Sequence, residues 1–281
     1  MIAQKSQKPE NAPTIARADF IEGMAKGMAV LESFDTERQR LNATQAAERA
    51  GLTRAAARRH LLTLAHLGYL ESDGSHFWLS AKVLRFSGTY LASARLPRTV
   101  QPTLNRLAAQ TRESFSVAVL EGDSVVIVAR SVAALPLAWD STTPYRTPAS
   151  MRLLAYGLHL GARLPVHATS TGRVLLAALP RAELSAWLEG RELPRLTPCT
   201  VVDTVALGRI LDEVRRNDCC LASEEHELGV HAIAVPLRNM EGRTVGALNA
   251  VLSQARLQSG AVQRELLPLL HDAARELRTL L

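Results

Sequence analysis

The sequence predicts an α+β fold in which a small, mainly helical N-terminal domain precedes a larger domain built on an antiparallel sheet. Residues 21–66 carry apolar side chains at helical spacings, interrupted by polar segments and a glycine. From about residue 98 the pattern changes to β-branched runs joined by glycine-containing turns, with helical stretches between them. The length of 281 residues exceeds one average domain and agrees with this division into two.

The composition argues against membrane and secreted proteins. No run of about 18 apolar residues is present, so a transmembrane helix is not expected. Residues 1–19 are polar, contain Pro9 and Pro13, and lack the apolar core of a secretory signal, so we expect a disordered tail. The three cysteines form no CxxC pair, which suits a reducing compartment. We therefore expect a cytoplasmic protein that makes no contact with a membrane.

Two helices open the predicted N-terminal domain, residues 20–80. Apolar side chains recur at spacings of three and four through residues 21–34, so they share one helical face. These side chains are Ile21, Met24, Met28, Leu31 and Phe34. Asn42 with Gln45 three residues later fits a capping box at the start of a second helix, and Gly51 is placed to end that helix.

A third helix, capped by Thr53 and stopped by Gly68, completes a helix-turn-helix. Its expected core positions, at i, i+4 and i+7, are Ala57, Leu61 and Leu64. Residues 69–80 then predict two short strands around the turn at 72–75. Two helices separated by a glycine turn and followed by a hairpin make a winged helix-turn-helix.

Residues 81–97 are expected to form a linker helix that runs to Pro97, and residues 98–281 the second domain. Its expected elements are a helix around 100–112, a hairpin over 114–130, a loop over 132–150, a strand in 151–161, a helix opened near Thr169 to Thr171, a helix near 204–217, strands over 231–237 and 244–252, and a final helix from about 260. This order indicates an α+β domain around an antiparallel sheet.

The arginine-bearing face of the third helix points to double-stranded DNA. From Arg49 to Leu70 the chain has four arginines and no acidic residue. An arginine side chain can form two hydrogen bonds with guanine in the major groove. Further arginines can contact phosphates and so position the protein on the DNA. A solvated helix face would look the same, but the capped helix before it and the hairpin after it favour DNA binding. The predicted DNA-binding residues are Thr53, Arg54, Ala55, Arg58, Arg59 and His76.

Catalytic and metal-binding patterns are weak, and we expect no cofactor. Residues 169–172 near His167 lack the G-x-S-x-G arrangement of a nucleophile elbow, and Ser or Thr ahead of an apolar helix is usually a cap. Residues 224–227 with His231 and the cysteine pair 219–220 match no paired zinc spacing, so a solvated charged turn is the better interpretation. The protein is therefore predicted not to be an enzyme.

A small-molecule pocket is a stronger candidate. If the last two strands converge with the helix after Thr169, then Asn249, Ser170 and Thr171 place polar groups in an apolar cavity. The free N–H groups of a helix start suit a carboxylate. The alternative is that Asn249 satisfies backbone groups inside the sheet, and the residues alone favour neither.

Several stretches together resemble the IclR family of bacterial transcription regulators. They are GMAKGMAVLESF, GLTRAAARRHLLTLAHLGYL, RLPVHATSTGRVLLA, EEHELGVHAIAVPL and GALNAVL, spread over most of residues 20–281. GLTRAAARRHLLTL and VLRFSGTYLASARL look most like the branch that regulates aromatic-acid breakdown, including protocatechuate and 4-hydroxybenzoate regulators. The resemblance implies a winged helix, a linker helix, a GAF-like effector domain, palindrome-like operators, and a homodimer or tetramer assembled through the DNA-binding half.

The resemblance also implies an effector site. By position it falls on Ser170, Thr171, Ala222, Ala232, Asn249 and Val251. Relatives carry an acidic residue, a cysteine and sometimes a serine where this chain has alanine, alanine and valine, so a more apolar pocket and an aromatic ligand are expected. Arg163 is a candidate partner for the ligand carboxylate, and the longer stretch 132–150 is either a lid or a surface loop.

The sequence thus predicts a ligand-responsive regulator of genes for catabolism of an aromatic or related organic acid. One alternative is an IclR-type regulator that responds to a non-aromatic small organic acid. Another is an effector-independent DNA-binding protein whose C-terminal domain only oligomerises. A filled core around Asn249 would favour that second alternative.

Overall fold

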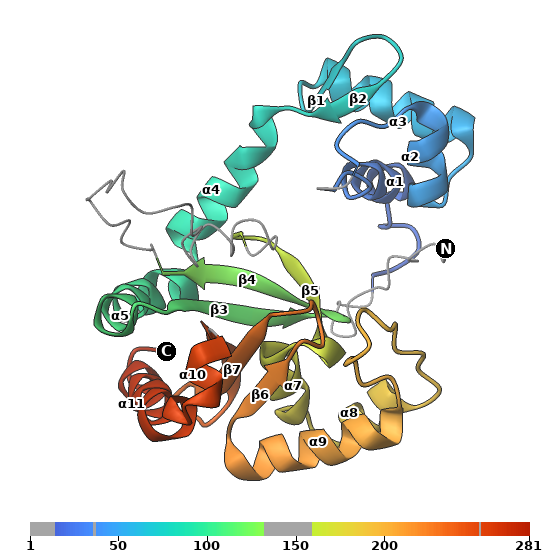
Figure 1. The fold of residues 1–281 in the computed structure, drawn as a ribbon. Coiled ribbons are helices and arrows are strands. Elements are labelled where there is room, and N and C mark those ends of the chain that lie inside the picture. The colour runs from blue at the N-terminus through green and yellow to red at the C-terminus, as the bar shows by residue number, and fades with distance from the viewer. Residues whose placement is uncertain (1–14, 36–37, 132–158, 253) are drawn as a thin grey trace, which may run out of the picture. The chain divides into compact units, whose positions relative to one another are not determined.

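The computed structural model describes residues 15–35, 38–131, 159–252 and 254–281. The chain divides into two compact units, Met1–Tyr90 and Leu91–Leu281, whose elements are labelled in Figure 1. The predicted loop over 132–150, most of the predicted strand in 151–161 and most of the predicted N-terminal tail lie outside the described residues. Within the described ranges, no helix has the length and apolar character needed to cross a membrane.

The N-terminal unit contains the predicted winged helix-turn-helix. Its elements are α1 (Glu22–Leu31), α2 (Ala43–Ala50), α3 (Arg54–His66), β1 (Leu70–Ser72) and β2 (Phe77–Leu79). The Asn42 side chain accepts the N–H groups of Thr44 and Gln45, and the Gln45 side chain accepts the Asn42 N–H. Gly51 ends α2 in the left-handed region at φ 65°. The predicted capping box and glycine stop are therefore both confirmed.

The core of this unit lies between α3, the hairpin and one side of α1. Ala57, Leu61 and Leu64 are buried as predicted, and the two leucines share a cluster with Val30 and Phe34. Most of the apolar face predicted for residues 21–34 lies on the surface of the single chain instead. Ile21 is 65% exposed, Met24 66% and Met28 51%. That exposed row is available to another molecule.

The prediction of a single linker helix is wrong. Residues 81–97 form a 3-10 turn (Ala81–Val83), the helix α4 (Leu84–Ser93) and the start of α5 (Arg95–Thr111). Ala94 is extended, at φ −65° and ψ 129°, and separates the two helices. Pro97 lies in the first turn of α5, where proline is tolerated because the N–H groups there have no intrahelical partner. It therefore helps to open a helix and does not close one.

The C-terminal unit is built on a six-stranded antiparallel sheet in the order β5-β4-β3-β8-β7-β6. Its strands are β3 (Ser114–Glu121), β4 (Ser124–Arg130), β5 (Arg163–Pro165), β6 (Cys220–Ser223), β7 (His231–Arg238) and β8 (Thr244–Leu252). Its helices after α5 are a 3-10 turn (Val166–Ala168), α7 (Ser170–Ala177), α8 (Arg181–Leu188), α9 (Thr204–Asn217), α10 (Gln254–Gln258), a π-helical turn (Val262–Leu266) and α11 (Leu267–Arg278). The α+β prediction is confirmed. The short elements α8, β5 and β6 were not predicted.

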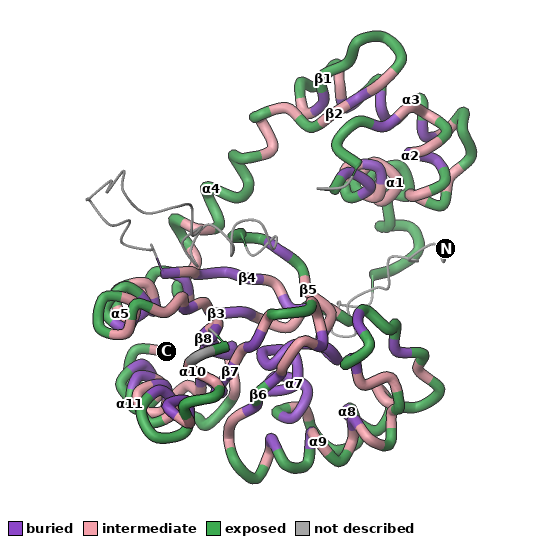
Figure 2. The backbone as a smooth tube through the Cα atoms, viewed as in Figure 1, coloured by how far each residue is buried: buried purple, intermediate pink, exposed green. Residues whose placement is uncertain are grey.

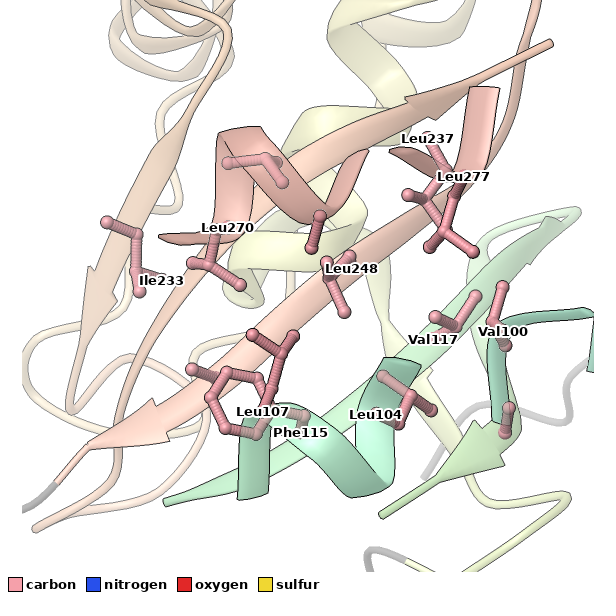
Figure 3. Close-up of a cluster of buried hydrophobic side chains, with 14 of the residues drawn as sticks. Val100, Leu104, Leu107, Phe115, Val117, Ile233, Leu237, Leu248, Leu270 and Leu277 are labelled. Atoms are coloured by element: carbon pink, nitrogen blue, oxygen red, sulfur yellow. The ribbon is translucent and has the colours of Figure 1, made fainter. Parts of the chain in front are cut away.

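Helices cover both faces of this sheet. On one face α5 and α11 bury a leucine-rich cluster against strand residues such as Phe115, Ile233 and Leu248 (Figure 3). On the other face α7, α8 and α9 pack over Ala234 and Ala247. All eight residues of α7 are buried, as the colouring in Figure 2 shows. Because side chains alternate along a strand, Asn249 points to the same face as Ala247, toward α7.

Candidate functional site: a recognition helix and an effector cavity

The recognition helix α3 presents the predicted residues to solvent. Thr53, Arg54, Ala55, Arg58 and Arg59 are all exposed. The hydroxyl oxygen of Thr53 accepts the Ala56 N–H at 3.2 Å, so this residue caps the helix as well as lying on its open side. Within the described chain, the guanidinium groups of the three arginines form no ion pair or hydrogen bond. They are therefore free to contact phosphates or base edges.

The hairpin is a rigid wing whose turn is organised by Asp73. One carboxylate oxygen of Asp73 accepts the N–H of Ser75 at 2.9 Å and that of His76 at 2.7 Å. Those hydrogen bonds lower the pKa of Asp73 to about 2. His76 is half-buried, with Nδ1 2.9 Å from the Ser75 hydroxyl. The guanidinium of Arg40 lies 4.1 Å above the ring of Trp78 on the same hairpin.

A cavity in the C-terminal unit unites the residues of the predicted pocket. It holds about 430 Å³ of empty space, a volume that includes solvent at its open mouth. The residues that line it are Leu164, Ala168, Thr169, Ser170, Thr171, Ala222, Glu225, His226, Val230, Ala232, Asn249 and Val251. Every predicted effector-site residue except Arg163 is among them. The core around Asn249 is therefore not filled.

The start of α7 forms one wall. The Thr169 hydroxyl oxygen accepts the Gly172 N–H at 3.1 Å, whereas the N–H groups of Ser170 and Thr171 have no acceptor in the described chain. Gly172 holds this wall in place, because a Cβ there would lie 2.2 Å from the carbonyl oxygen of Val166. The helix start can approach the preceding 3-10 turn so closely only with glycine at this position.

The floor is a small-residue surface around one fixed amide. The pairings Ala222 with Ala232 and Ala232 with Val251 set three lining residues side by side across β6, β7 and β8. Asn249 is 9% exposed, and its side-chain oxygen accepts the Ser116 hydroxyl at 2.5 Å. The Asn249 amide nitrogen has no protein partner in the described chain. This amide is therefore oriented by β3 and keeps a donor for a ligand.

A buried ion pair supports the cavity from behind. Arg173 on α7 forms a bidentate pair with Glu225, with Nη1 2.6 Å from Oε1 and Nη2 bonded to Oε2. Arg173 also donates from Nε to the His167 carbonyl at 2.8 Å, and Glu225 accepts the Val201 N–H at 3.1 Å. The side chains are only 2% and 10% exposed. The pair therefore ties α7, the β6–β7 connection and the segment before α9 together while leaving no net charge.

Two histidines lie close to this pair. His167 is buried, and its Nε2 lies 3.0 Å from the Pro194 carbonyl oxygen. Burial lowers the pKa of His167. Burial, with a smaller effect from the charge of His167, also lowers the pKa of His226. Neither ring nitrogen of His226 has a hydrogen-bond partner among the described residues, and its Nδ1 is fully buried. Burial therefore favours the neutral form of the His226 ring.

Two sequence predictions about this region are corrected. Arg163 does not reach the cavity: it lies on the strand β5, where its neighbour Leu164 faces inward, so the arginine points away and pairs with Glu121 at 2.7 Å. The supposed solvated charged turn at 224–227 contains the buried Glu225. Across the described ranges, no three His, Cys, Asp or Glu side chains are grouped so as to hold a metal.

A helix-turn-helix joined to a domain with a lined small-molecule cavity defines a ligand-responsive transcription regulator. Two family models match the chain: the IclR helix-turn-helix domain over residues 23–74 and the bacterial transcriptional regulator IclR C-terminal domain over residues 146–279. The chain belongs to the IclR family of bacterial transcriptional regulators.

Several relatives are similar over nearly their whole length. The chain is 48% identical to the Pca operon regulatory protein of Acinetobacter baylyi, covering 96% of this chain and 93% of that protein. It is 49% identical to the p-hydroxybenzoate hydroxylase transcriptional activator of the same organism, covering 97% and 96%. The PobR inducer-binding domain from Acinetobacter, a double mutant crystallised with 3-hydroxybenzoic acid, matches at 46% identity with a TM-score of 0.56, covering 66% of this chain and 98% of that one.

Proposed function

We propose that this regulator senses a hydroxylated aromatic acid in the cavity of its C-terminal unit and controls genes for the breakdown of such acids. The observation that carries the proposal is the cavity itself. It is lined by small apolar side chains and a few polar groups, in a domain similar to one that holds 3-hydroxybenzoic acid. Like other regulators that bind chromosomal DNA, it would act in the cytoplasm.

The cavity recognises an acid through neutral donors. Among its described lining residues only Glu225 carries a full charge at neutral pH, and Arg173 neutralises it. The free N–H groups of Ser170 and Thr171 at the start of α7 offer a carboxylate the positive end of a helix. The Asn249 amide supplies another donor beside them. Ala222, Ala232 and Val251 leave room for a ring, whereas a two- or three-carbon acid would leave apolar surface uncovered.

DNA binding is assigned to the N-terminal unit. Arg54, near the start of α3, is placed to read base edges, with Ala55 small enough for close approach, and Arg58 and Arg59 are placed to contact phosphates. Thr53 fixes the start of the helix, and His76 lies on the wing. The exposed face formed by Ile21, Met24 and Met28 supports assembly of two copies, which gives two recognition helices for a palindromic site.

Removal of single arginines from α3 should weaken DNA binding without unfolding the protein. We expect Arg54→Ala to reduce affinity for a DNA fragment selected from a random pool by about 5- to 100-fold, with relaxed sequence preference. Arg58→Ala should weaken binding to all sequences and reduce the salt slope by about 1. Arg209→Ala, an equally exposed arginine on α9, is the matched control. Affinities equal to the control in a gel-shift titration would show that this face does not contact DNA.

A thermal-shift screen tests the proposed ligand class. Ligands that bind the folded state raise the melting temperature by mass action. We expect stabilisation by 3- or 4-hydroxybenzoate or by protocatechuate, and none by pyruvate or glyoxylate. A response to the short keto acids alone would favour the regulator of a non-aromatic acid. A melting temperature that none of these acids raises would favour a C-terminal unit that only oligomerises.

A further inference from the structure

The imidazole of His226 lines the cavity, and neither of its ring nitrogens has a hydrogen-bond partner in the described chain. It enters the cavity from the connection between β6 and β7, whereas Ser170 and Thr171 enter from α7. Polar groups inside a protein normally have a partner, because an unpaired one loses the hydrogen bonds that water would supply. A ligand that fills the cavity must therefore satisfy this ring or leave it unpaired.

The carboxylate of Glu225 and the imidazole of His167, which lie nearby, already have partners. Both carboxylate oxygens of Glu225 bind Arg173, and the Nε2 of His167 lies 3.0 Å from the Pro194 carbonyl oxygen. Neither is available to a ligand without breaking a buried interaction. The neutral His226 ring holds one N–H donor and one bare acceptor nitrogen. Because Nδ1 is fully buried, only Nε2 can face a ligand. A phenolic hydroxyl can pair with Nε2 in either tautomer, as an acceptor when this nitrogen carries the proton and as a donor when it does not, whereas a carboxylate can only accept.

Resting on the proposed function, we propose that His226 recognises the ring hydroxyl of the aromatic acid and so determines which substituted benzoates the regulator senses. The ligand then spans the cavity, with its carboxylate at the start of α7 and its hydroxyl at the β6–β7 connection. A benzoate without a hydroxyl fills the same space but leaves the imidazole unpaired. Sites built to hydrogen-bond a hydroxyl discriminate strongly against analogues that lack it.

The test is calorimetric titration of the full-length protein with benzoate, 3-hydroxybenzoate and 4-hydroxybenzoate. The wild type should bind one of the two hydroxybenzoates at least about tenfold more tightly than benzoate. His226→Leu should reduce that preference to within about twofold, because the hydroxybenzoate loses a partner and benzoate no longer leaves an imidazole unpaired. His226→Gln, which keeps a donor and an acceptor, should restore part of the preference.

His231→Leu is the matched control. His231 is also buried with both ring nitrogens unpartnered in the described chain, but it does not line the cavity. This variant should keep the full preference of the wild type. A hydroxyl preference that survives in His226→Leu, or a wild type that binds benzoate as tightly as both hydroxybenzoates, would overturn the role of His226 and leave the proposed function standing. A wild type that binds none of the three acids and is not stabilised by protocatechuate would overturn both.

Discussion

Replacement of Asn249 by leucine should strongly weaken the binding of the aromatic acid while DNA binding remains. The amide lies on the cavity floor, 9% exposed, and is held by the Ser116 hydroxyl. Leucine removes the donor that faces the ligand and leaves the Ser116 hydroxyl unpaired. A lost hydrogen bond with an unpaired buried group costs about 1–3 kcal/mol, so we expect affinity to fall by about 5- to 150-fold.

Ser116→Ala gives a graded comparison for this prediction. It leaves the Asn249 amide in place but frees it to rotate, so affinity should fall by only a few fold. Both variants are measured by calorimetric titration with the acid that most stabilises the wild type. Wild-type affinity in Asn249→Leu would show that the amide serves the sheet and not a ligand, which was the alternative left open by the sequence.

Separation of the Arg173–Glu225 pair should destabilise the C-terminal unit more than any surface change. Removal of one partner leaves an uncompensated charge in the interior, which costs about 3–5 kcal/mol. We expect a loss of that size for Arg173→Met and for Glu225→Gln in urea unfolding followed by circular dichroism. The double variant should lose less than the sum, because it removes both buried charges together.

The exposed pair between Arg106 and Glu276 provides the control for that measurement. Its side chains are 43% and 57% exposed, so Glu276→Gln should cost no more than about 1 kcal/mol. Destabilisation by Glu225→Gln no greater than that of the control would show that the buried pair adds nothing beyond a surface pair.

Features with local causes were predictable from the sequence. The capping box of Asn42 and Gln45, the glycine stop at Gly51 and the buried face of α3 depend on residues within two turns of one another. The floor of the cavity could also be predicted from the sequence, because strand alternation and the family resemblance together place Asn249 and Val251 on one face. The winged helix and the last two strands also lie where the spacing of apolar and turn residues predicts them, because that spacing is local to each element.

Features that depend on tertiary contact were not predictable. Glu225 is buried because Arg173, 52 residues earlier in the chain, meets it. In sequence it stands in a run of charged residues that is typical of a solvated turn. Arg163 was predicted to meet the ligand carboxylate, and only the pairing of β5 with β4 shows that its side chain points away from the cavity. Pro97 looked like the end of a helix because proline is compatible with both the start and the stop of one.

Occupation of the cavity should change the affinity of the N-terminal unit for DNA. This affinity is measured by fluorescence anisotropy of the full-length protein on a DNA fragment selected from a random pool, with and without saturating hydroxybenzoate. We expect the Kd to change by about 5- to 150-fold in the wild type, the usual range of coupling between sites, and to stay constant in Asn249→Leu. An unchanged Kd in the wild type, at ligand concentrations that stabilise the protein, would contradict the account.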